Sequence, residues 1–246
     1  MANEYERRFY PESGFGGFTD IDGTMAFYTR INALLEPTAI VLDVGCGRAS
    51  FDEELCGFKK NLRILKRKAA KVIGLDVDRN AASNPFLDEF RLIEIGKKWP
   101  VEDDSIDLIV CDNVLEHIVD PDAFFAEIAR VLKNRGVLCM RTPNSWNYIA
   151  LAARLIPNRH HAKALAFVQD GRKEEDVFPT IYGCNNVWKL NRMLRKHGFK
   201  ERAVYGYEAE PSYLSFSWYI YGLGVLHQKF APSFLKAALF VFARKG

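Results

Sequence analysis

Short apolar runs alternate with helix-like segments through the middle of the chain. In the segment 121–133, apolar residues recur every three or four positions, Pro121 suits the first helical turn, and Gly136 follows as a stop signal. The apolar runs are β-rich and occupy residues 39–44, 71–75, 90–95, 106–111 and 137–141. This alternation predicts an α/β fold, in which helices cover both faces of a parallel sheet and ligands bind beyond the carboxyl ends of the strands.

The pattern changes after residue 141. Residues 142–184 contain Pro143, Pro157 and Pro179 and no clear strand. The sequence then predicts a helix, a strand, an aromatic helix and a last strand, over residues 185–197, 199–206, 214–230 and 235–243. No repeat and no linker interrupts this order, so we expect a single domain with an insertion.

Composition and charge exclude several classes of protein. Among 246 residues, 48% are hydrophobic and 26% are charged, which rules out general disorder. The formal net charge of +3 lacks the clustered excess of base expected of a nucleic-acid-binding protein. The five cysteines form no C-x-x-C pair and no zinc-finger spacing with histidine. Cys46, Cys111 and Cys139 lie in or beside apolar runs, which favours a role as small buried side chains.

Targeting signals are not evident, so we expect a cytoplasmic protein. The N-terminus lacks the apolar core of a signal peptide. The longest apolar stretch, residues 214–226, is shorter than the roughly 20 residues that span a bilayer. The basic run 59–68 places Leu62, Leu65 and Ala69 at helical spacing, which favours a solvated helix face. Contact with an anionic polymer or, peripherally, with a membrane surface is the alternative role of this run.

The strongest local signal is the run Val41–Gly47, an apolar strand that enters a glycine turn. Gly45 and Gly47 allow the backbone to bend sharply and to approach a ligand closely. A nicotinamide-dependent enzyme uses such a turn for a pyrophosphate, but its G-x-G-x-x-G pattern is incomplete here, because Ser50 occupies the last position. Asp43 would also repel a phosphate, so a ligand with a cationic amino-acid end suits the turn better.

A second signal is Asp76, which ends the strand-like run 71–76. An acid at this place accepts hydrogen bonds from the two ribose hydroxyls in nucleotide-binding α/β folds. The alternative role of Asp76 is that of a helix N-cap, although Asp78 is better placed to cap the next helix.

Three segments together carry a more specific signal. They read VLDVGCGRAS at 41–50, VIGLDVD at 72–78 and WPVEDDSIDLIVCDNVLEHIVDPDAFFAEIARVLKNRGVLCMRTPN at 99–144. Their combination resembles class I S-adenosylmethionine-dependent methyltransferases, of the broad group called type 11 or type 23 methyltransferases. The resemblance covers about residues 39–144. It implies S-adenosylmethionine as the cofactor and a Rossmann-like, seven-stranded, mostly parallel sheet whose last strand runs antiparallel.

The resemblance also implies which residues bind the cofactor. Asp43 and the glycine turn are expected beside the methionine part, and Asp76 beside the ribose. The loop 95–99 lacks the acid that often contacts adenine in the family, and Ala49 replaces a common third glycine. The expected cofactor-binding residues are Asp43, Gly45, Cys46, Gly47, Asp76, Val77 and Asp112.

In this interpretation the methyltransferase domain, residues 1–246, has four parts. They are an N-terminal lid and helix, a cofactor-binding core, a substrate-side insertion and the C-terminal part of the sheet, over residues 1–38, 39–144, 145–184 and 185–246. The aromatic, glycine-rich segment 15–23 and the insertion are expected to close over a bound ligand. Tyr28 and Arg30, on the helix that follows this segment, are candidates for binding the cofactor carboxylate, and the alternative for Arg30 is a pair on the surface.

His117 is the candidate catalytic residue. It follows the fourth strand, at the edge where ligands bind, and an imidazole titrates near neutral pH, as a general base requires. The alternative is that Glu116 and His117 only orient the loop through hydrogen bonds. His160 and His161 are adjacent, so their side chains diverge; we expect a substrate-lining or surface role for them and no metal site.

The sequence therefore predicts a methyltransferase that modifies oxygen, nitrogen or carbon of a small-molecule or carrier- or lipid-linked acceptor. The alternative in another class is a non-catalytic protein that keeps the fold for binding or scaffolding. A NAD-dependent oxidoreductase is disfavoured by Asp43 and by the incomplete glycine pattern. Nucleic-acid methylation is also disfavoured, because the chain reads CDNVLEH where an Asn-Pro-Pro-Tyr-type motif would follow the fourth strand.

Overall fold

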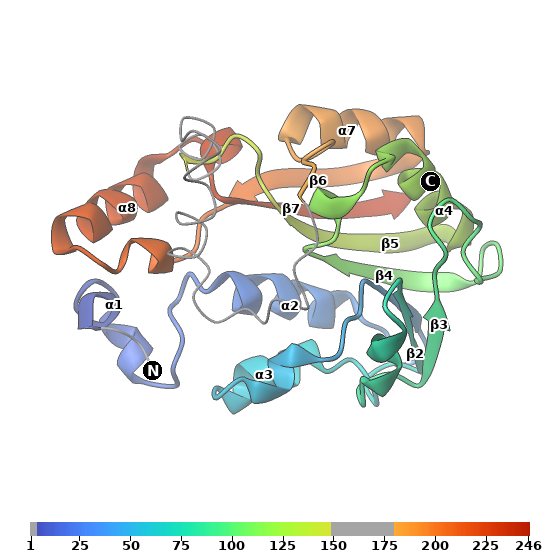
Figure 1. Ribbon diagram of the computed structural model, residues 1–246, viewed down its shortest axis with the longest axis horizontal. Helices are drawn as coiled ribbons and strands as arrows, with labels where there is room; N and C mark the ends of the chain where they lie inside the picture. The colour runs from blue at the N-terminus through green and yellow to red at the C-terminus, as the bar shows by residue number, and fades with distance from the viewer. Residues whose placement is uncertain (1–3, 149–179) are drawn as a thin grey trace.

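The computed structural model describes residues 4–148 and 180–246. Within them, seven strands form one sheet in the order β3-β2-β1-β4-β5-β7-β6 (Figure 1). The strands are β1 Ile40–Val44, β2 Lys71–Asp76, β3 Glu89–Leu92, β4 Ile106–Asp112, β5 Leu132–Pro143, β6 Phe199–Tyr207 and β7 Ala238–Lys245. Strand β7 runs antiparallel to both β5 and β6, and the other neighbours are parallel. The predicted Rossmann-like sheet with an antiparallel last strand is confirmed.

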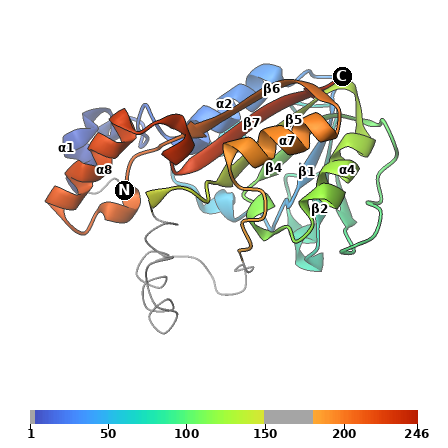
Figure 2. The same cartoon turned by 90° about the horizontal axis from the view of Figure 1, so that it is seen from above.

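Helices cover both faces of this sheet. The helices of the described residues are α1 Glu4–Phe9, α2 Gly23–Leu34, α3 Gly57–Arg63, α4 Pro121–Val131, α7 Val187–Lys196 and α8 Trp218–Phe230, and four of them cover the sheet. Helices α4 and α7 lie on one face, and α2 and α3 on the other (Figures 1 and 2). Leu42 and Val44 of β1 pack in the apolar cluster under α4 and α7, whereas Val41 packs in the cluster under α2. Burial on both faces explains why the central strands read as continuous apolar runs.

Two helix predictions are wrong at their carboxyl ends. The helix predicted over 121–133 ends at Val131, because Leu132 already pairs with Ile106 as the first residue of β5. Gly136 consequently lies inside the strand and not at a helix end. In the basic run, α3 ends at Arg63, and Arg67 has a positive φ of 70°, so no helix reaches Ala69.

Helices α1 and α8 pack against each other at the left of Figure 1, away from the sheet. Their shared core contains Tyr10, Tyr221 and Val225. The predicted helix over 214–230 begins only at Trp218. Core packing explains one face of α8, since Tyr221 is fully buried, but Leu223 on the other face is 65% exposed. Among the described residues, no helix is long and apolar enough to span a membrane.

Candidate functional site

The glycine turn after β1 is fixed by backbone hydrogen bonds to β2. The amides of Gly45 and Cys46 donate to the carbonyl oxygen of Leu75, at 2.7 and 3.2 Å. Gly45 has a φ of +71°, and a Cβ atom there would lie 2.3 Å from a methyl carbon of Val114, so only glycine fits. At Gly47, whose φ is +53°, a Cβ would meet no atom within 4 Å. The turn is therefore tight against the protein at Gly45 and open at Gly47.

Ala49 stands in the left-handed region, with a φ of 63°. An alanine in this conformation costs about 1 kcal/mol relative to glycine. The glycine that the resemblance expects at this place therefore has a conformational reason, and the alanine here is tolerated at a modest cost in stability.

The carboxylate of Asp76 links the turn to the end of β2. Its Oδ2 accepts from the amide of Gly47 at 2.9 Å, and its Oδ1 accepts from the amide of Asp78 at 2.9 Å. Each oxygen keeps a lone pair for a further donor. Asp78 in turn accepts from the amide of Asn80, so Asp78 is the cap, as predicted, and the carboxylate of Asp76 is directed to the turn.

Three carboxylates gather where β1, β2 and β4 end. Burial, together with the negative charges of Asp112 and Asp76, raises the pKa of Asp43 to about 7, against the lowering effect of Arg63. A cationic ligand beside this carboxyl stabilises its ionised form, which burial disfavours, and the ionised carboxylate in turn attracts the ligand. The electrostatics of the turn thus favour a cationic ligand and disfavour a phosphate.

Asp112, at the end of β4, is already bound by a cation of the protein. Nε and Nη2 of Arg141 donate to its two oxygens at 2.6 and 2.7 Å, and the hydroxyl of Tyr28 donates to Oδ2 at 3.1 Å. Nη1 of Arg141 also donates to Thr24, at 3.1 Å. The arrangement joins β4, β5 and α2, so Asp112 contributes structure and negative potential at the predicted place.

The loop after β4 rests on a buried acid. Glu116 is 3% exposed and accepts from the hydroxyl of Thr142 at 3.0 Å. Its carbonyl oxygen accepts from the amides of Ile181 and Tyr182, at 2.7 and 3.2 Å. Burial raises the pKa of Glu116. Nε2 of His117 lies 3.9 Å from Oε1 of Glu116, too far for a hydrogen bond, and the imidazole is 26% exposed at the edge of the sheet.

The predicted site residues fall into three groups. Asp43, Gly45, Cys46, Gly47 and Asp76 lie together at the ends of β1 and β2. Val77, 42% exposed, follows directly after β2, and Asp112 and His117 lie at and after the end of β4. His160, His161 and most of the insertion 145–184 lie outside the described residues. Within the described parts of the chain, no cluster of three His, Cys, Asp or Glu side chains is arranged to hold a metal ion.

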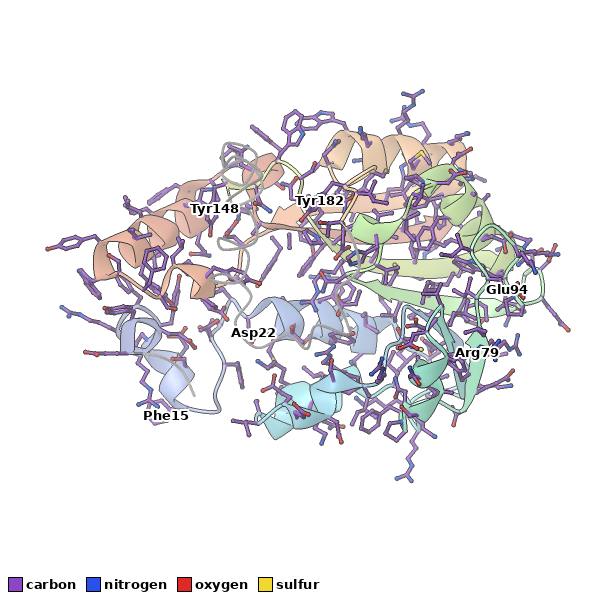
Figure 3. All side chains as sticks on the ribbon, in the orientation of Figure 1. Phe15, Asp22, Arg79, Glu94, Tyr148 and Tyr182 are labelled. Carbon is purple, nitrogen blue, oxygen red and sulfur yellow. The ribbon has the colours of Figure 1, made fainter. Side chains whose placement is uncertain are left out.

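For Arg30, the structure favours the alternative role on the surface. Arg30 of α2 is exposed, and its guanidinium lies over the ring of Phe242, 5.6 Å from the ring centroid. That ring belongs to β7, away from the glycine turn. Figure 3 shows the labelled Asp22 at the start of α2, where its carboxylate caps the helix by accepting from the amides of Thr24 and Met25.

Two groups at the site were not predicted. The side-chain amide of Asn84 donates to the carbonyl oxygens of Cys46 and Gly47, at 3.1 and 3.2 Å, and so holds the turn from behind. Arg63 lies close enough to Asp43 for its positive charge to offset part of the rise in the pKa of that carboxyl caused by burial. Neither was detectable as a motif, because Asn84 is 37 and 38 positions from its partners and Arg63 belongs to a basic run.

The order of the strands and the antiparallel β7 define a class of fold, that of the Rossmann-like methyltransferases. A family model described as a methyltransferase domain matches residues 35–198, about two thirds of the chain. The chain belongs to this methyltransferase-domain family, and S-adenosylmethionine is the cofactor that the membership assigns.

Individual relatives agree with this assignment. A probable S-adenosylmethionine-dependent methyltransferase of Mycobacterium tuberculosis is 32% identical over 108 residues, which cover 42% of this chain and 35% of that protein. A ubiquinone biosynthesis O-methyltransferase of Neisseria meningitidis is 29% identical over 129 residues, 47% of this chain and 50% of that protein. The matches thus span between about a third and a half of the length of these relatives. A solved structure of a SAM-dependent methyltransferase from Archaeoglobus fulgidus shares the fold, with a TM-score of 0.55 and 18% identity over 97% of this chain and 99% of that chain.

The residues at the turn fit this cofactor. It carries a sulfonium, an ammonium and a ribose and no phosphate, which suits a cluster of three carboxylates. The open direction at Gly47 leaves room for a ligand to approach the backbone. Asp43 would hold the ammonium and Asp76 the ribose hydroxyls, while Asp112 adds negative potential from its place beside Arg141.

Proposed function

We propose that the protein is an S-adenosylmethionine-dependent methyltransferase whose acceptor is a small molecule or a carrier- or lipid-linked precursor. The observation that carries the proposal is the meeting of Asp43, Asp76 and the open glycine turn at one edge of the sheet. When bound, S-adenosylmethionine supplies an electrophilic methyl group on a sulfonium. The residues of the chain have to position the acceptor against it, and such positioning contributes roughly 7–11 kcal/mol to lowering a reaction barrier.

His117 is proposed as the group that takes the proton from the acceptor. It lies in the 3-10 segment Leu115–His117, which begins three residues after the end of β4, on the ligand-binding edge. The carboxylate of Glu116 fixes this segment to β5 by accepting from the hydroxyl of Thr142. The side-chain amide of Asn185 donates to the same hydroxyl oxygen at 2.6 Å. A ring nitrogen of His117 would accept the proton of a hydroxyl or a charged amine as the acceptor is methylated.

Aromatic side chains favour an acceptor with a ring or an apolar portion. Tyr182 is bound through its amide to the carbonyl of Glu116, and burial and the negative charge of Glu116 raise the pKa of its hydroxyl. Tyr213 is near enough to raise the pKa of both Tyr182 and Tyr148. Tyr148 in turn packs edge-on against His227 of α8, at 4.8 Å between ring centroids. Figure 3 shows Tyr148 toward α8 and Tyr182 toward the sheet.

The affinity for S-adenosylhomocysteine, the product form of the cofactor, is expected to depend on pH through Asp43. Its pKa of about 7 means that the carboxyl is largely protonated below that pH, and binding the ammonium must then release a proton. The affinity should therefore fall about tenfold for each pH unit below 7 and level off above it. Calorimetric titrations between pH 5.5 and pH 8.5 measure this.

Asp43→Asn is the control for this pH dependence. The variant should bind weakly at every pH, with a flat profile. Because the folded protein holds the Asp43 proton more tightly than the unfolded chain, the wild type loses stability as pH rises from about 4 to 7, and the variant should not show this loss. A wild-type affinity that is constant across the range contradicts the role of Asp43.

His117→Asn is expected to lower turnover by roughly 10²–10³-fold with a hydroxyl or amine acceptor, as removal of a general base does. Affinity for S-adenosylhomocysteine should change less than about twofold, because the substitution leaves the glycine turn intact. Steady-state kinetics and calorimetry on the same preparation separate the two effects. Turnover that survives the substitution would assign His117 to orienting the loop.

The experiment that tests the proposed function is transfer of a labelled methyl group. The protein is incubated with S-adenosylmethionine carrying a labelled methyl and with a panel of phenols, amines and carrier- or lipid-linked acids. We expect label in at least one acceptor, and none with Asp76→Ala. Cofactor binding without transfer to any acceptor would favour the non-catalytic binding protein.

A further inference from the structure

Arg63, the last residue of α3, has no counter-ion among the described residues although it is partly buried. Its guanidinium carbon lies 4.4 Å from the ring centroid of Phe51 and 5.5 Å from that of Tyr28. Its Nε is buried and has no hydrogen-bond partner. A guanidinium presents five donors, and leaving a buried donor unpaired is costly. The two rings contact the face of the guanidinium, and its Nε–H group has no acceptor among the described residues.

The position of Arg63 is fixed by its neighbours. The side-chain amide of Asn32, on α2, donates to the carbonyl of Leu62 at 2.8 Å, and Nζ of Lys68 donates to the amide oxygen of Asn32 at 3.0 Å. These bonds fasten the end of α3 to α2, the helix that also carries Tyr28. Arg63 is thus held in place on the protein side and is not a mobile surface cation.

The cation stands beside the ligand-binding carboxylate. Burial and the charge of Asp112 raise the pKa of Asp43 and that of the Tyr28 hydroxyl, and the positive charge of Arg63 offsets part of both rises. The Tyr28 hydroxyl itself donates to Asp112. Arg63 and Asp43 form no ion pair within the described residues, so each remains available to an opposite charge. A cation and an anion side by side in a partly buried place match the carboxylate and the ammonium of an α-amino acid.

Two other cations of the described chain, Arg48 and Lys59, already have carboxylate partners. Arg48 binds Asp78 at 2.9 Å, and Lys59 binds Asp22 at 3.1 Å. Among the described residues, Arg63 combines a position near Asp43 with a buried donor that has no partner.

We infer that Arg63 binds the α-carboxylate at the methionine end of the cofactor while Asp43 binds the ammonium. This assignment rests on the proposed function and extends it to a residue between β1 and β2. A planar guanidinium binds a carboxylate through two parallel hydrogen bonds, whereas a lysine at the same place makes a single point contact. Arg63 therefore selects ligands that carry the complete amino-acid end.

The test compares two ligands that differ in that end. S-adenosylhomocysteine has the carboxylate and the ammonium, whereas 5′-methylthioadenosine keeps the adenosine and the thioether sulfur and lacks both. Calorimetric titrations of the whole protein use the wild type, Arg63→Met and Arg63→Lys. Lys60→Met is the matched control, because Lys60 lies on the same helix and pairs with Asp52, whose side chain is 55% exposed.

We expect Arg63→Met to weaken S-adenosylhomocysteine binding by roughly 10- to 100-fold and to change methylthioadenosine binding by less than about twofold. Arg63→Lys should fall between the wild type and Arg63→Met for S-adenosylhomocysteine. Lys60→Met should match the wild type for both ligands.

Two results would overturn the inference while leaving the proposed function intact. In one, Arg63→Met and Arg63→Lys bind S-adenosylhomocysteine as the wild type does. In the other, Arg63→Met weakens the binding of both ligands equally, which would mean that Arg63 maintains the structure of the site and does not contact the carboxylate. If the wild type binds neither ligand, the proposed function fails and this inference fails with it. Melting temperatures of all variants establish that each is folded. If Arg63→Met does not fold, the affinity of Arg63→Lys for S-adenosylhomocysteine tests the inference.

Discussion

Arg141→Met is expected to lower the free energy of unfolding by about 3–5 kcal/mol, the range found when one partner of a buried ion pair is removed. Arg141 and Asp112 are 13% and 11% exposed, and both oxygens of Asp112 are bound by the guanidinium. Methionine keeps an apolar stem against Phe27, over which the guanidinium lies at 5.3 Å. The lower free energy of unfolding would therefore come from the buried carboxylate of Asp112, which loses its cation and lies near a second acid, Asp43.

Urea denaturation measures this loss, and Lys133→Met is its control. Lys133 binds Asp107 at 2.8 Å, but the two side chains are 40% and 34% exposed, so water screens the pair. We expect its removal to cost less than about 1 kcal/mol. Adding Asp112→Asn to Arg141→Met should recover part of the stability, because the unpaired charge is then gone. Equal losses for Arg141→Met and Lys133→Met would show that the buried pair has no special weight.

Asp76→Ala is expected to lower the affinity for S-adenosylhomocysteine by about 100-fold or more, since each hydrogen bond to a charged group contributes about 1.5–3 kcal/mol. The carboxylate is proposed to accept from the ribose hydroxyls. It also accepts from the amides of Gly47 and Asp78, so its removal loosens the glycine turn that approaches the cofactor. Loss of the direct contact and loss of the turn geometry act in the same direction.

Asp88→Ala separates binding from folding. Asp88 also accepts from a backbone amide of β2, that of Val72 at 2.8 Å, but it does so at the amino end of the strand. Its loss should cost stability and leave calorimetric affinity within about twofold, as for a residue remote from the ligand. If Asp76→Ala binds S-adenosylhomocysteine as well as Asp88→Ala does, Asp76 is not a cofactor ligand.

The central strands were predictable from sequence because both of their faces are buried. The apolar runs 39–44, 71–75 and 106–111 end within one residue of β1, β2 and β4. Predictions were wrong where tertiary pairing competes with a local pattern. The helical spacing in 121–133 continues through Leu132, yet the pairing of Leu132 with Ile106 ends α4 one residue earlier.

The site was predictable where its residues form a motif. Asp43, Gly45 and Gly47 are contiguous with β1, and Asp76 ends β2, so alternation and turn chemistry place them at one edge of the sheet. Contacts between residues far apart in the chain have no motif in the sequence, so they could not be predicted from it. Arg141 follows Asp112 by 29 positions on a neighbouring strand, so the sequence did not predict that the two residues pair. Runs of charged residues are usually solvated, so nothing in the basic run 59–68 indicated that Arg63 would have no counter-ion among the described residues.

The central claim is that this edge of the sheet binds S-adenosylmethionine, and calorimetric titration of the wild-type protein with S-adenosylhomocysteine tests it most directly. NADH is titrated beside it, because a nicotinamide cofactor would use a similar glycine turn. We predict saturable one-to-one binding of S-adenosylhomocysteine, tighter at pH 8 than at pH 6 as Asp43 ionises near pH 7, and no binding of NADH. A folded protein that fails to bind S-adenosylhomocysteine, or that binds NADH instead, would contradict the account.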